Sequence, residues 1–390
     1  MARKPKRHIP QSADELTAAW FTAALAGSSG GATVTAVDHE RLGEGIGFLG
    51  DLVRCSLTWS DNAETLPSSV VAKLPSSISA NRALGEGLMA YEREIIVYRD
   101  LADSMGIPMP QYFHSDLDKH PAPWINDVVR WLMDHLPVRG VAWMIDRLLK
   151  MPESAMRRFV LIMEDIDDAR PAHQFAGGTL DDAYPALVLL AKFHAHHWMN
   201  QALLDEEPLI WGLNRTPKVF KATYQNNRDD FIERFGEMFE PEVLAKMDSV
   251  QDDLGAMVDR LVEPPWTILH GDYRLDNILF RDGGDIVVLD YQLLLWGRPG
   301  WDVAYFITTA LDSEHRAEEE NMLTIYHDAL AGEGISDYSL EQLRTDAAVT
   351  KAILAHRMIG GANTIETQIE GRDESFLDVM VRRVTGWVDA

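Results

Sequence analysis

The sequence has little cysteine, few cations and no long apolar run. Its 390 residues include one cysteine, Cys55, which excludes an intrachain disulfide and a cysteine-based zinc site and fits a reducing, cytoplasmic setting. No apolar stretch approaches the roughly 18 uninterrupted residues that a membrane-spanning helix needs. With 36 Lys and Arg against 61 Asp and Glu, the net charge is −25, and we find no cationic face of the kind that binds nucleic acid. Nucleic acid and a membrane span are therefore not expected.

What the chain does have is an ordinary globular composition. Hydrophobic residues make up 46% and charged residues 25%, so the acidity does not indicate a disordered tail. At this length a single core stops growing, and two lobes are expected. The basic start of the chain and the apolar residues up to Leu25 imitate a secretory signal. The capping-box pattern from Ser12 to Glu15 favours an ordinary first helix instead.

Apolar periodicity divides the chain into a first lobe with a sheet and a helical second lobe. Strands of a small antiparallel sheet are expected at 33–42, 52–59, 69–73, 111–114 and 159–163. Apolar residues three and four apart predict one helix over 81–102, and a helical insertion that carries tryptophans occupies about 115–158. Two short strands within 266–289 interrupt the later helices. We place the first lobe at 1–166 and the second at 167–390.

The most informative stretch runs from 268 to 292. Apolar strands flank the polar residues His270, Asp272 and Asn277, and the second arm of the same hairpin ends at Asp290. Two carboxylates and an amide would therefore meet at one end of this hairpin. Phosphoryl transfer needs a carboxylate for the proton of the acceptor hydroxyl and hard oxygen ligands for Mg²⁺. The stretch therefore favours a phosphotransferase site.

His270-Gly271-Asp272, with Asn277 five residues after the aspartate and then a strand ending in Asp290-Tyr291-Gln292, resembles the aminoglycoside phosphotransferase and choline kinase superfamily. Together with the later Gly297, Pro299 and Asp302, the stretch is most similar to the ecdysteroid-kinase-like branch and related bacterial phosphotransferases. The resemblance covers roughly Ile46 to Phe306. It implies a bilobal, protein-kinase-like α+β fold with a small antiparallel-sheet N-lobe and a larger, mostly helical C-lobe.

The same resemblance implies roles for single residues. Asp272 would be the catalytic base, Asn277 and Asp290 would hold Mg²⁺, and Asp302 would anchor the loop from behind. Arg274 stands where the family often has histidine, so we count it as a catalytic candidate whose role against the γ-phosphate is open. The cofactors implied are ATP and Mg²⁺.

A glycine string, Gly45, Gly47 and Gly50, matches both a kinase phosphate-covering hairpin and a dinucleotide-binding turn. The residues after it read as a strand, which favours the hairpin, because a dinucleotide fold requires a helix there. A merely structural turn is the remaining alternative. Lys73 ends a buried type of strand and needs an anion. The resemblance implies Glu94 as its partner, with Glu92 as the rival, and the α- and β-phosphates as its ligand.

Two further stretches are read through the resemblance. Backbone groups near Glu164 and Ile166 would hydrogen-bond the edge of adenine. The histidines from His194 to His197 sit close enough on a helix to suggest a metal site. The resemblance supports the plainer interpretation, in which His194 is satisfied in an apolar core.

We expect a cytoplasmic, ATP-dependent phosphotransferase that acts on a hydroxyl of a small-molecule alcohol. The alternatives are a nucleotide-binding pseudokinase that senses or scaffolds and, on the glycine string alone, a dinucleotide-dependent oxidoreductase. The acceptor stays open among aminoglycoside, choline-like, steroid-like and hydroxyacyl thioester compounds. The insertion, with Trp124, Trp131 and Trp143, is expected to add packing. Its alternatives are a homodimer contact, a lid over an apolar substrate and a membrane-surface contact.

Overall fold

The structure is a computed structural model that describes residues 8–42, 49–60, 65–119, 124–172, 175–207, 209–362 and 375–387. The chain folds into two compact units. The first unit consists of Met1–Ala102, Pro110–Pro123 and Leu148–Asp167. The second consists of Asp103–Met109, Trp124–Arg147 and Asp168–Ala390.

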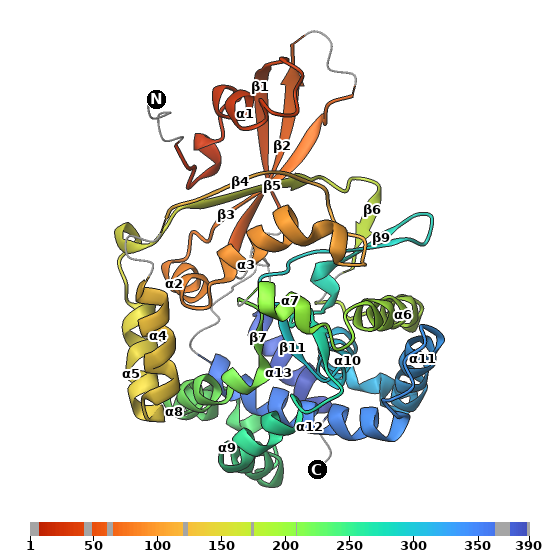
Figure 1. Cartoon of the computed structure of the whole chain (residues 1–390). Helices are drawn as coiled ribbons and strands as arrows, with labels where there is room; N and C mark the ends of the chain where they lie inside the picture. The colour runs from red at the N-terminus through yellow and green to blue at the C-terminus, as the bar shows by residue number, and fades with distance from the viewer. Residues whose placement is uncertain are drawn as a thin grey trace. The chain divides into compact units, whose positions relative to one another are not determined.

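The first unit is built on a five-stranded antiparallel sheet in the order β1-β2-β3-β5-β4 (Figure 1). The strands are β1 (Val34–Leu42), β2 (Gly50–Trp59), β3 (Ser69–Pro75), β4 (Tyr112–Leu117) and β5 (Phe159–Glu164). Helix α1 (Ala18–Ala24) packs Trp20 and Phe21 on one face of this sheet, against a core that includes Cys55. Burial raises the pKa of the Cys55 thiol to about 12. The five expected strands are confirmed.

The first helix begins later than the sequence pattern suggests. Ala13–Glu15 forms a short 3₁₀ turn, η1, and Ser12 makes no capping hydrogen bond with its side chain. Helix α1 is capped instead by Thr17, whose Oγ1 accepts from the Trp20 N–H at 3.2 Å. The expected capping box at Ser12 is therefore wrong, although the helix itself is present.

The single helix expected over 81–102 is broken into α2 (Ser79–Gly87) and α3 (Ala90–Ile96), with a π turn, η2 (Val97–Leu101), after them. Met89, at the break, has a left-handed φ of 51°. The break places the Tyr91 ring against Gly85, where a Cβ would lie 2.7 Å from the ring. Tyr91 also stacks on Phe159 at 4.2 Å between centroids. Tertiary packing overrides the continuous helical period here.

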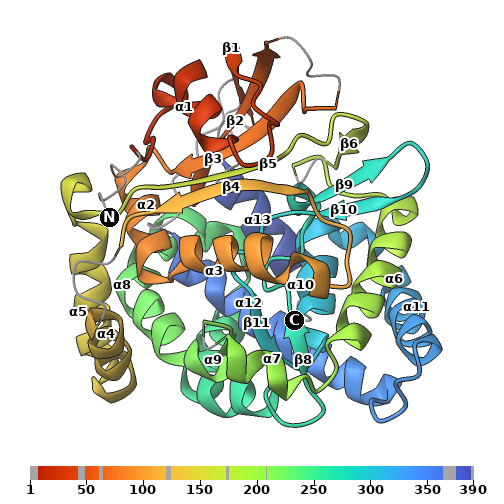
Figure 2. The ribbon, with the colours of Figure 1, turned by 45° about the horizontal axis from the view of Figure 1, so that its top comes forward.

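Helices make up most of the second unit. They are α4 (Trp124–His135), α5 (Val138–Leu149, whose last two residues belong to the first unit), α6 (Leu180–His196), α7 (Gln201–Glu206), α8 (Pro217–Phe235), α9 (Pro241–Arg260), α10 (Gly300–Ala310), α11 (Glu319–Gly332), α12 (Leu340–Gly361) and α13 (Phe376–Gly386). Helix α12 packs against α8, α9, α10 and α13 in one apolar core, and α6 and α11 lie side by side (Figure 2). Short turns are η3 (Ala102–Ser104), η4 (Glu153–Ala155), η5 (Leu213–Arg215), η6 (Gly236–Met238), η7 (Leu275–Asn277) and η8 (Ser313–Glu318).

Two small sheets complete the second unit. Their orders are β10-β9-β6 and β7-β11-β8. The strands are β6 (Ala169–Pro171), β7 (Trp211–Gly212), β8 (Thr267–Leu269), β9 (Ile278–Arg281), β10 (Ile286–Val288) and β11 (Leu295–Gly297). The β9–β10 hairpin is the one expected from the sequence.

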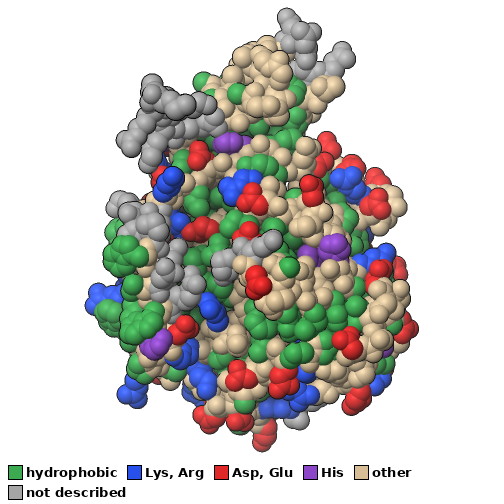
Figure 3. All heavy atoms as spheres, in the orientation of Figure 1, with side chains coloured by type: hydrophobic (Ala, Val, Ile, Leu, Met, Phe, Trp, Pro, Cys, Tyr) green, Lys and Arg blue, Asp and Glu red, His purple; other side chains and the backbone are tan. Residues whose placement is uncertain are grey.

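The expected insertion is the helical pair α4–α5. Trp124, Trp131 and Trp143 are 63%, 57% and 62% exposed, so these three rings do not add to the core as expected. Hydrophobic side chains gather on this flank of the surface (Figure 3). A homodimer contact through it stays a prediction. Among the helices that the structure describes, none has the length and apolar character needed to cross a membrane.

Candidate active site

The loop from His270 to Asn277 connects β8 to β9 and is held from behind by Asp302 of α10. The Asp302 carboxylate, which is fully buried, accepts from the backbone N–H of His270 at 2.6 Å and from that of Gly271 at 3.1 Å. The His270 ring bonds through Nε2 to the carbonyl of Leu289 at 2.9 Å. The anchoring expected of Asp302 is confirmed.

Gly271 is required by the path of this loop. Its φ of 78° lies in the left-handed region, and a Cβ there would overlap the carbonyl oxygen of Leu293. The loop therefore passes so close to the segment after β10 that no side chain fits at this position. This close passage sets the position of the next residue, Asp272.

Three donors hold the Asp272 carboxylate. The hydroxyl of Tyr305 donates to Oδ1 at 2.7 Å, while Nε of Arg274 and Nδ2 of Asn277 donate to Oδ2 at 3.2 and 3.1 Å. The Asn277 amide also donates to the Asp272 carbonyl at 2.8 Å. The Asp272 side chain is 15% exposed. The carboxylate is thus oriented by its partners while keeping some access to solvent.

Arg274 is directed at carboxylates of its own loop. Its side chain, 8% exposed, pairs with Asp272 and, through Nη1, with Asp276 at 2.9 Å. Burial lowers the pKa of Arg274, but the charges of Asp272 and Asp276 outweigh it and the net shift is upward. Burial, reinforced by the Asp272 charge, raises the pKa of Tyr305. Both donors therefore keep their protons near neutral pH, whereas the role of Arg274 toward a phosphate stays a prediction.

The β9–β10 hairpin brings Asn277 and Asp290 to the same end. Strand pairing joins Ile278 to Val288, and the N–H of Leu289 extends it by donating to the Asn277 carbonyl at 2.9 Å. Asp290 follows with a left-handed φ of 63°, which is uncommon for a residue other than glycine. A conformation of this kind persists only where the surrounding structure holds it.

The possible ligands at this end of the β9–β10 hairpin suit Mg²⁺, which also binds phosphates and water, better than they suit a metal ion coordinated by protein side chains alone. Asn277 uses its amide N–H groups on Asp272, which turns its amide oxygen, the atom that a metal would bind, away from that residue. Within the described ranges no group of three or more His, Cys, Asp or Glu side chains could hold an ion. Mg²⁺ is commonly held by one or two protein ligands together with phosphates and water. Asn277 and Asp290 match that pattern.

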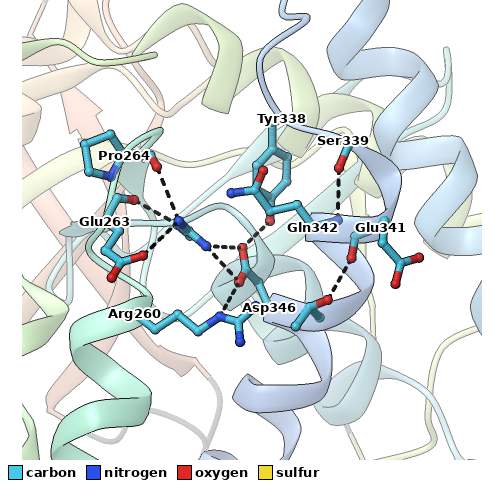
Figure 4. A network of polar contacts seen from close by, with 10 residues as sticks. Arg260, Glu263, Pro264, Tyr338, Ser339, Glu341, Gln342 and Asp346 are labelled. Atoms are coloured by element: carbon cyan, nitrogen blue, oxygen red, sulfur yellow. Dashed lines mark hydrogen bonds and ion pairs between the residues drawn. The ribbon is translucent and has the colours of Figure 1, made fainter.

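The segment before α10 is tied to the C-terminal helices by a buried polar network. Arg298 donates to Asp346 of α12 at 3.2 Å and to the carbonyl of Glu263 at 3.0 Å. The Tyr338 hydroxyl donates to Asp346 at 2.9 Å, and Nε of Arg260 lies 3.7 Å from the same carboxylate (Figure 4). Burial raises the pKa of Asp346 although Arg298 lies beside it. This network positions the start of the helix that carries Asp302.

The first unit contains the predicted lysine pair. Lys73 Nζ lies 2.7 Å from Oε1 of Glu94, and the two side chains are 5% and 1% exposed. Glu92, the rival, pairs with Arg157 instead. The pair joins β3 to α3, and its role toward a nucleotide stays a prediction.

Of the glycine string, Gly45 and Gly47 lie outside the described residues. Strands β1 and β2, on either side of the string, are antiparallel neighbours with Leu42 opposite Leu52, and a strand follows the string where a helix would be needed for a dinucleotide fold. A Cβ on Gly50 would lie 2.8 Å from the Leu74 carbonyl oxygen, so glycine permits close approach of β2 to β3. The expected strand after the string is confirmed, so the dinucleotide interpretation loses the helix that it needs, and the phosphate-covering role of the glycines stays a prediction.

Glu164 and Ile166 lie at the end of β5 and just after it. The N–H of Glu164 donates to the Gln111 carbonyl at 2.9 Å, and its side chain accepts from the Gln111 N–H at 3.0 Å. Both groups therefore hold the start of β4, and an adenine contact would depend on other backbone groups nearby. Ile166 is buried. The adenine contact stays a prediction.

The model of the ecdysteroid kinase-like family matches residues 44–334. The chain belongs to the ecdysteroid kinase-like family. Two similar solved structures are an ethanolamine kinase of Plasmodium vivax and a choline kinase of Cryptosporidium parvum Iowa II.

Both solved structures are 12% identical to this ecdysteroid kinase-like protein. The first match covers 90% of this chain and 80% of that one with a TM-score of 0.51; the second covers 90% and 88% with 0.50. They show a protein-kinase-like α+β fold, as expected. No curated protein sequence matches the chain.

His194 of α6 is a structural residue in this member of the family. His194 is fully buried, with Nδ1 2.6 Å from the Tyr326 hydroxyl and Nε2 3.3 Å from Asp302. Burial lowers its pKa. The interpretation of His194 as a core residue is confirmed. Through its contact with Asp302, His194 also supports the residue that anchors the loop.

Tyr305 is the site residue that the sequence analysis missed. It follows Asp302 by three residues on α10, so both side chains face the same loop. That spacing was available in the sequence, but nothing in the family motif pointed to it.

Proposed function

We propose that this protein is an ATP- and Mg²⁺-dependent phosphotransferase that transfers the γ-phosphate to a hydroxyl of a small-molecule alcohol. The observation that carries the proposal is the Asp272 carboxylate, held by Arg274, Asn277 and Tyr305 beside the hairpin end that bears Asp290. Membership of a kinase-like family supports the reaction class. The ethanolamine and choline kinases of similar fold are named for alcohol acceptors, which agrees with it.

Asp272 would act on the acceptor hydroxyl. As the hydroxyl oxygen forms its bond to the γ-phosphorus, Asp272 takes the proton, and the bond to the β-phosphate oxygen breaks to release ADP. General-base help of this kind contributes on the order of 10²–10⁴ in rate. Because the carboxylate is fixed by three donors before the acceptor binds, its orientation requires little further ordering.

The remaining residues would bind the nucleotide. Asn277 and Asp290 would hold Mg²⁺, which neutralises charge on the transferring group when bound. Lys73, oriented by Glu94, would contact the α- and β-phosphates. The amides of Gly45, Gly47 and Gly50 would cover the phosphates, and backbone groups near Glu164 and Ile166 would bind adenine.

The proposal is tested first by binding. Mg-ATP should raise the melting temperature by mass action, NADH should not, and a chelator should remove most of the effect. Asp272→Ala should keep Mg-ATP binding and lose transfer to any member of a broad alcohol panel. Asp290→Ala should weaken Mg-ATP itself. Asp282→Ala, an exposed aspartate in the turn of the same hairpin, is the matched control and should change neither.

The results separate the alternatives. Mg-ATP binding without transfer to any alcohol would favour the pseudokinase. Absence of both would contradict a nucleotide site. If the Asp272 and Asp290 variants behaved alike, the division of roles between them would be wrong.

A further inference from the structure

Among the residues that the structure describes, Arg357 of α12 is a cation of the second unit without an anionic partner. Its guanidinium carbon lies 4.7 Å from the centroid of the Phe220 ring of α8 and 5.9 Å from that of Trp301 of α10. Within the described part of the chain, Arg357 makes no hydrogen bond or ion pair, and the residue is half-buried. Stacking on aromatic faces leaves the N–H donors at the edge of the guanidinium available.

Arg357 lies close to the residues that hold Asp272. Trp301 and Tyr305 are four residues apart on α10, so they share a face and stand about 6 Å apart along the axis. Tyr305 donates to Asp272. Burial raises the pKa of Tyr305 most, and the charges of Arg357 and Arg274 act in the opposite direction. Both arginines therefore act on the Tyr305 phenol.

Arg274 and Arg357 differ in the groups that their guanidinium contacts. Arg274 pairs with Asp272 and Asp276, whereas Arg357 contacts the Phe220 and Trp301 rings and makes no ion pair among the described residues. A guanidinium matches carboxylate and phosphate with paired N–H donors. The Phe220 ring, half-buried beside it, adds apolar surface for a carbon chain.

We propose that Arg357 binds an oxyanion, a carboxylate or a phosphate, of the same acceptor whose hydroxyl reaches Asp272. The inference rests on the proposed function and narrows its substrate class to alcohols that carry an anionic group several bonds from the hydroxyl. The positive charge of Arg357 would repel a cationic amino alcohol. A neutral alcohol would leave the guanidinium without a partner.

The test compares four compounds with one carbon chain. They are 6-hydroxyhexanoate, its methyl ester, 6-hydroxyhexyl phosphate and 6-aminohexanol. Binding to the full chain is measured by calorimetry without nucleotide, and transfer is measured separately with Mg-ATP. The carboxylate or the phosphate should bind about 10- to 100-fold more tightly than the ester, as a charge-assisted pair implies. The comparison of 6-hydroxyhexanoate with 6-hydroxyhexyl phosphate shows whether a carboxylate or a phosphate is the preferred anion.

Variants assign the preference to Arg357. Arg357→Gln should abolish it while the ester binds as before, and Arg357→Lys should retain part of it. Arg215→Gln is the matched control, because Arg215 is an exposed arginine 5.9 Å from the Trp211 ring, and it should keep the full preference. Urea unfolding of each variant shows whether it is folded.

The outcomes are distinct from those for the proposed function. Equal binding of anion and ester, no measurable binding of either anion, tighter binding of 6-aminohexanol, or a preference that survives Arg357→Gln would overturn the inference. An anion preference that depends on Arg357 without Mg-ATP binding or transfer would uphold the anion site and refute the kinase.

Discussion

The steric demand at Gly271 gives the sharpest structural prediction. Gly271→Ala places a methyl group in a left-handed residue, which costs about 1–2 kcal/mol, and overlaps that methyl with the Leu293 carbonyl oxygen. Backbone cannot rotate away as a side chain can, so the loop or the segment after β10 must shift. Overpacking of this kind typically costs a further 1–3 kcal/mol, approximately. The expected total loss of unfolding free energy is about 2–5 kcal/mol.

Gly284, in the turn of the β9–β10 hairpin, supplies the control. Its φ of 88° is also left-handed, but a Cβ there meets nothing within 4 Å. Gly284→Ala should therefore show only the conformational cost of about 1–2 kcal/mol. If the two variants have equal m values, urea unfolding measures the difference between their unfolding free energies directly.

Activity provides a second measurement of the same variants. A shift of about 1 Å in the loop that carries Asp272 should lower kcat about 10²-fold with the acceptor found in the alcohol panel, whereas Gly284→Ala should leave kcat unchanged. Equal stability losses for the two alanine variants would refute the steric reasoning, whatever the protein's activity proves to be.

Two further predictions concern buried charge. Lys73→Met removes the cation 2.7 Å from Glu94 and should lower the unfolding free energy by about 3 kcal/mol. Adding Glu94→Leu should recover part of this loss in urea unfolding. A double variant no more stable than Lys73→Met would contradict the coupling between the two residues. Burial lowers the pKa of His197 from 6.5 to about 4, so below pH 6.5 the unfolded state binds a proton that the folded state does not. The unfolding free energy therefore keeps its full value above pH 6.5 and falls as the pH drops below that value, by about 2 kcal/mol at pH 5. His197→Gln should flatten this dependence by the same amount, and an unchanged difference between pH 7.5 and pH 5 would show that another group carries it.

Much of the geometry of the candidate site was predictable because its motif is local. Asp272, Asn277 and Asp290 lie on one hairpin, and the strand pairing that brings them together depends on short apolar runs visible in the sequence. The Asp302 anchor was also predictable through the resemblance. Tyr305 was not, because a tyrosine in a buried helix more often serves packing.

The elements that the sequence analysis misplaced share a cause. Continuous helical spacing predicts one helix through 81–102, but the contact of Tyr91 with Gly85 and Phe159 breaks it at Met89. The exposed tryptophans of α4–α5 show the converse, because helical spacing places them on one face but does not say what covers that face.

By itself the sequence determined the strands, the hairpin and the residue types that meet at its end, because these follow from apolar periods and from residues near one another in the chain. Tertiary structure alone decided which side chains became partners: Tyr305 for Asp272, Glu94 over Glu92 for Lys73, and aromatic rings for Arg357. Such pairings depend on how helices and strands distant in the chain pack, and in a chain with a net charge of −25 that packing decides where the few cations act.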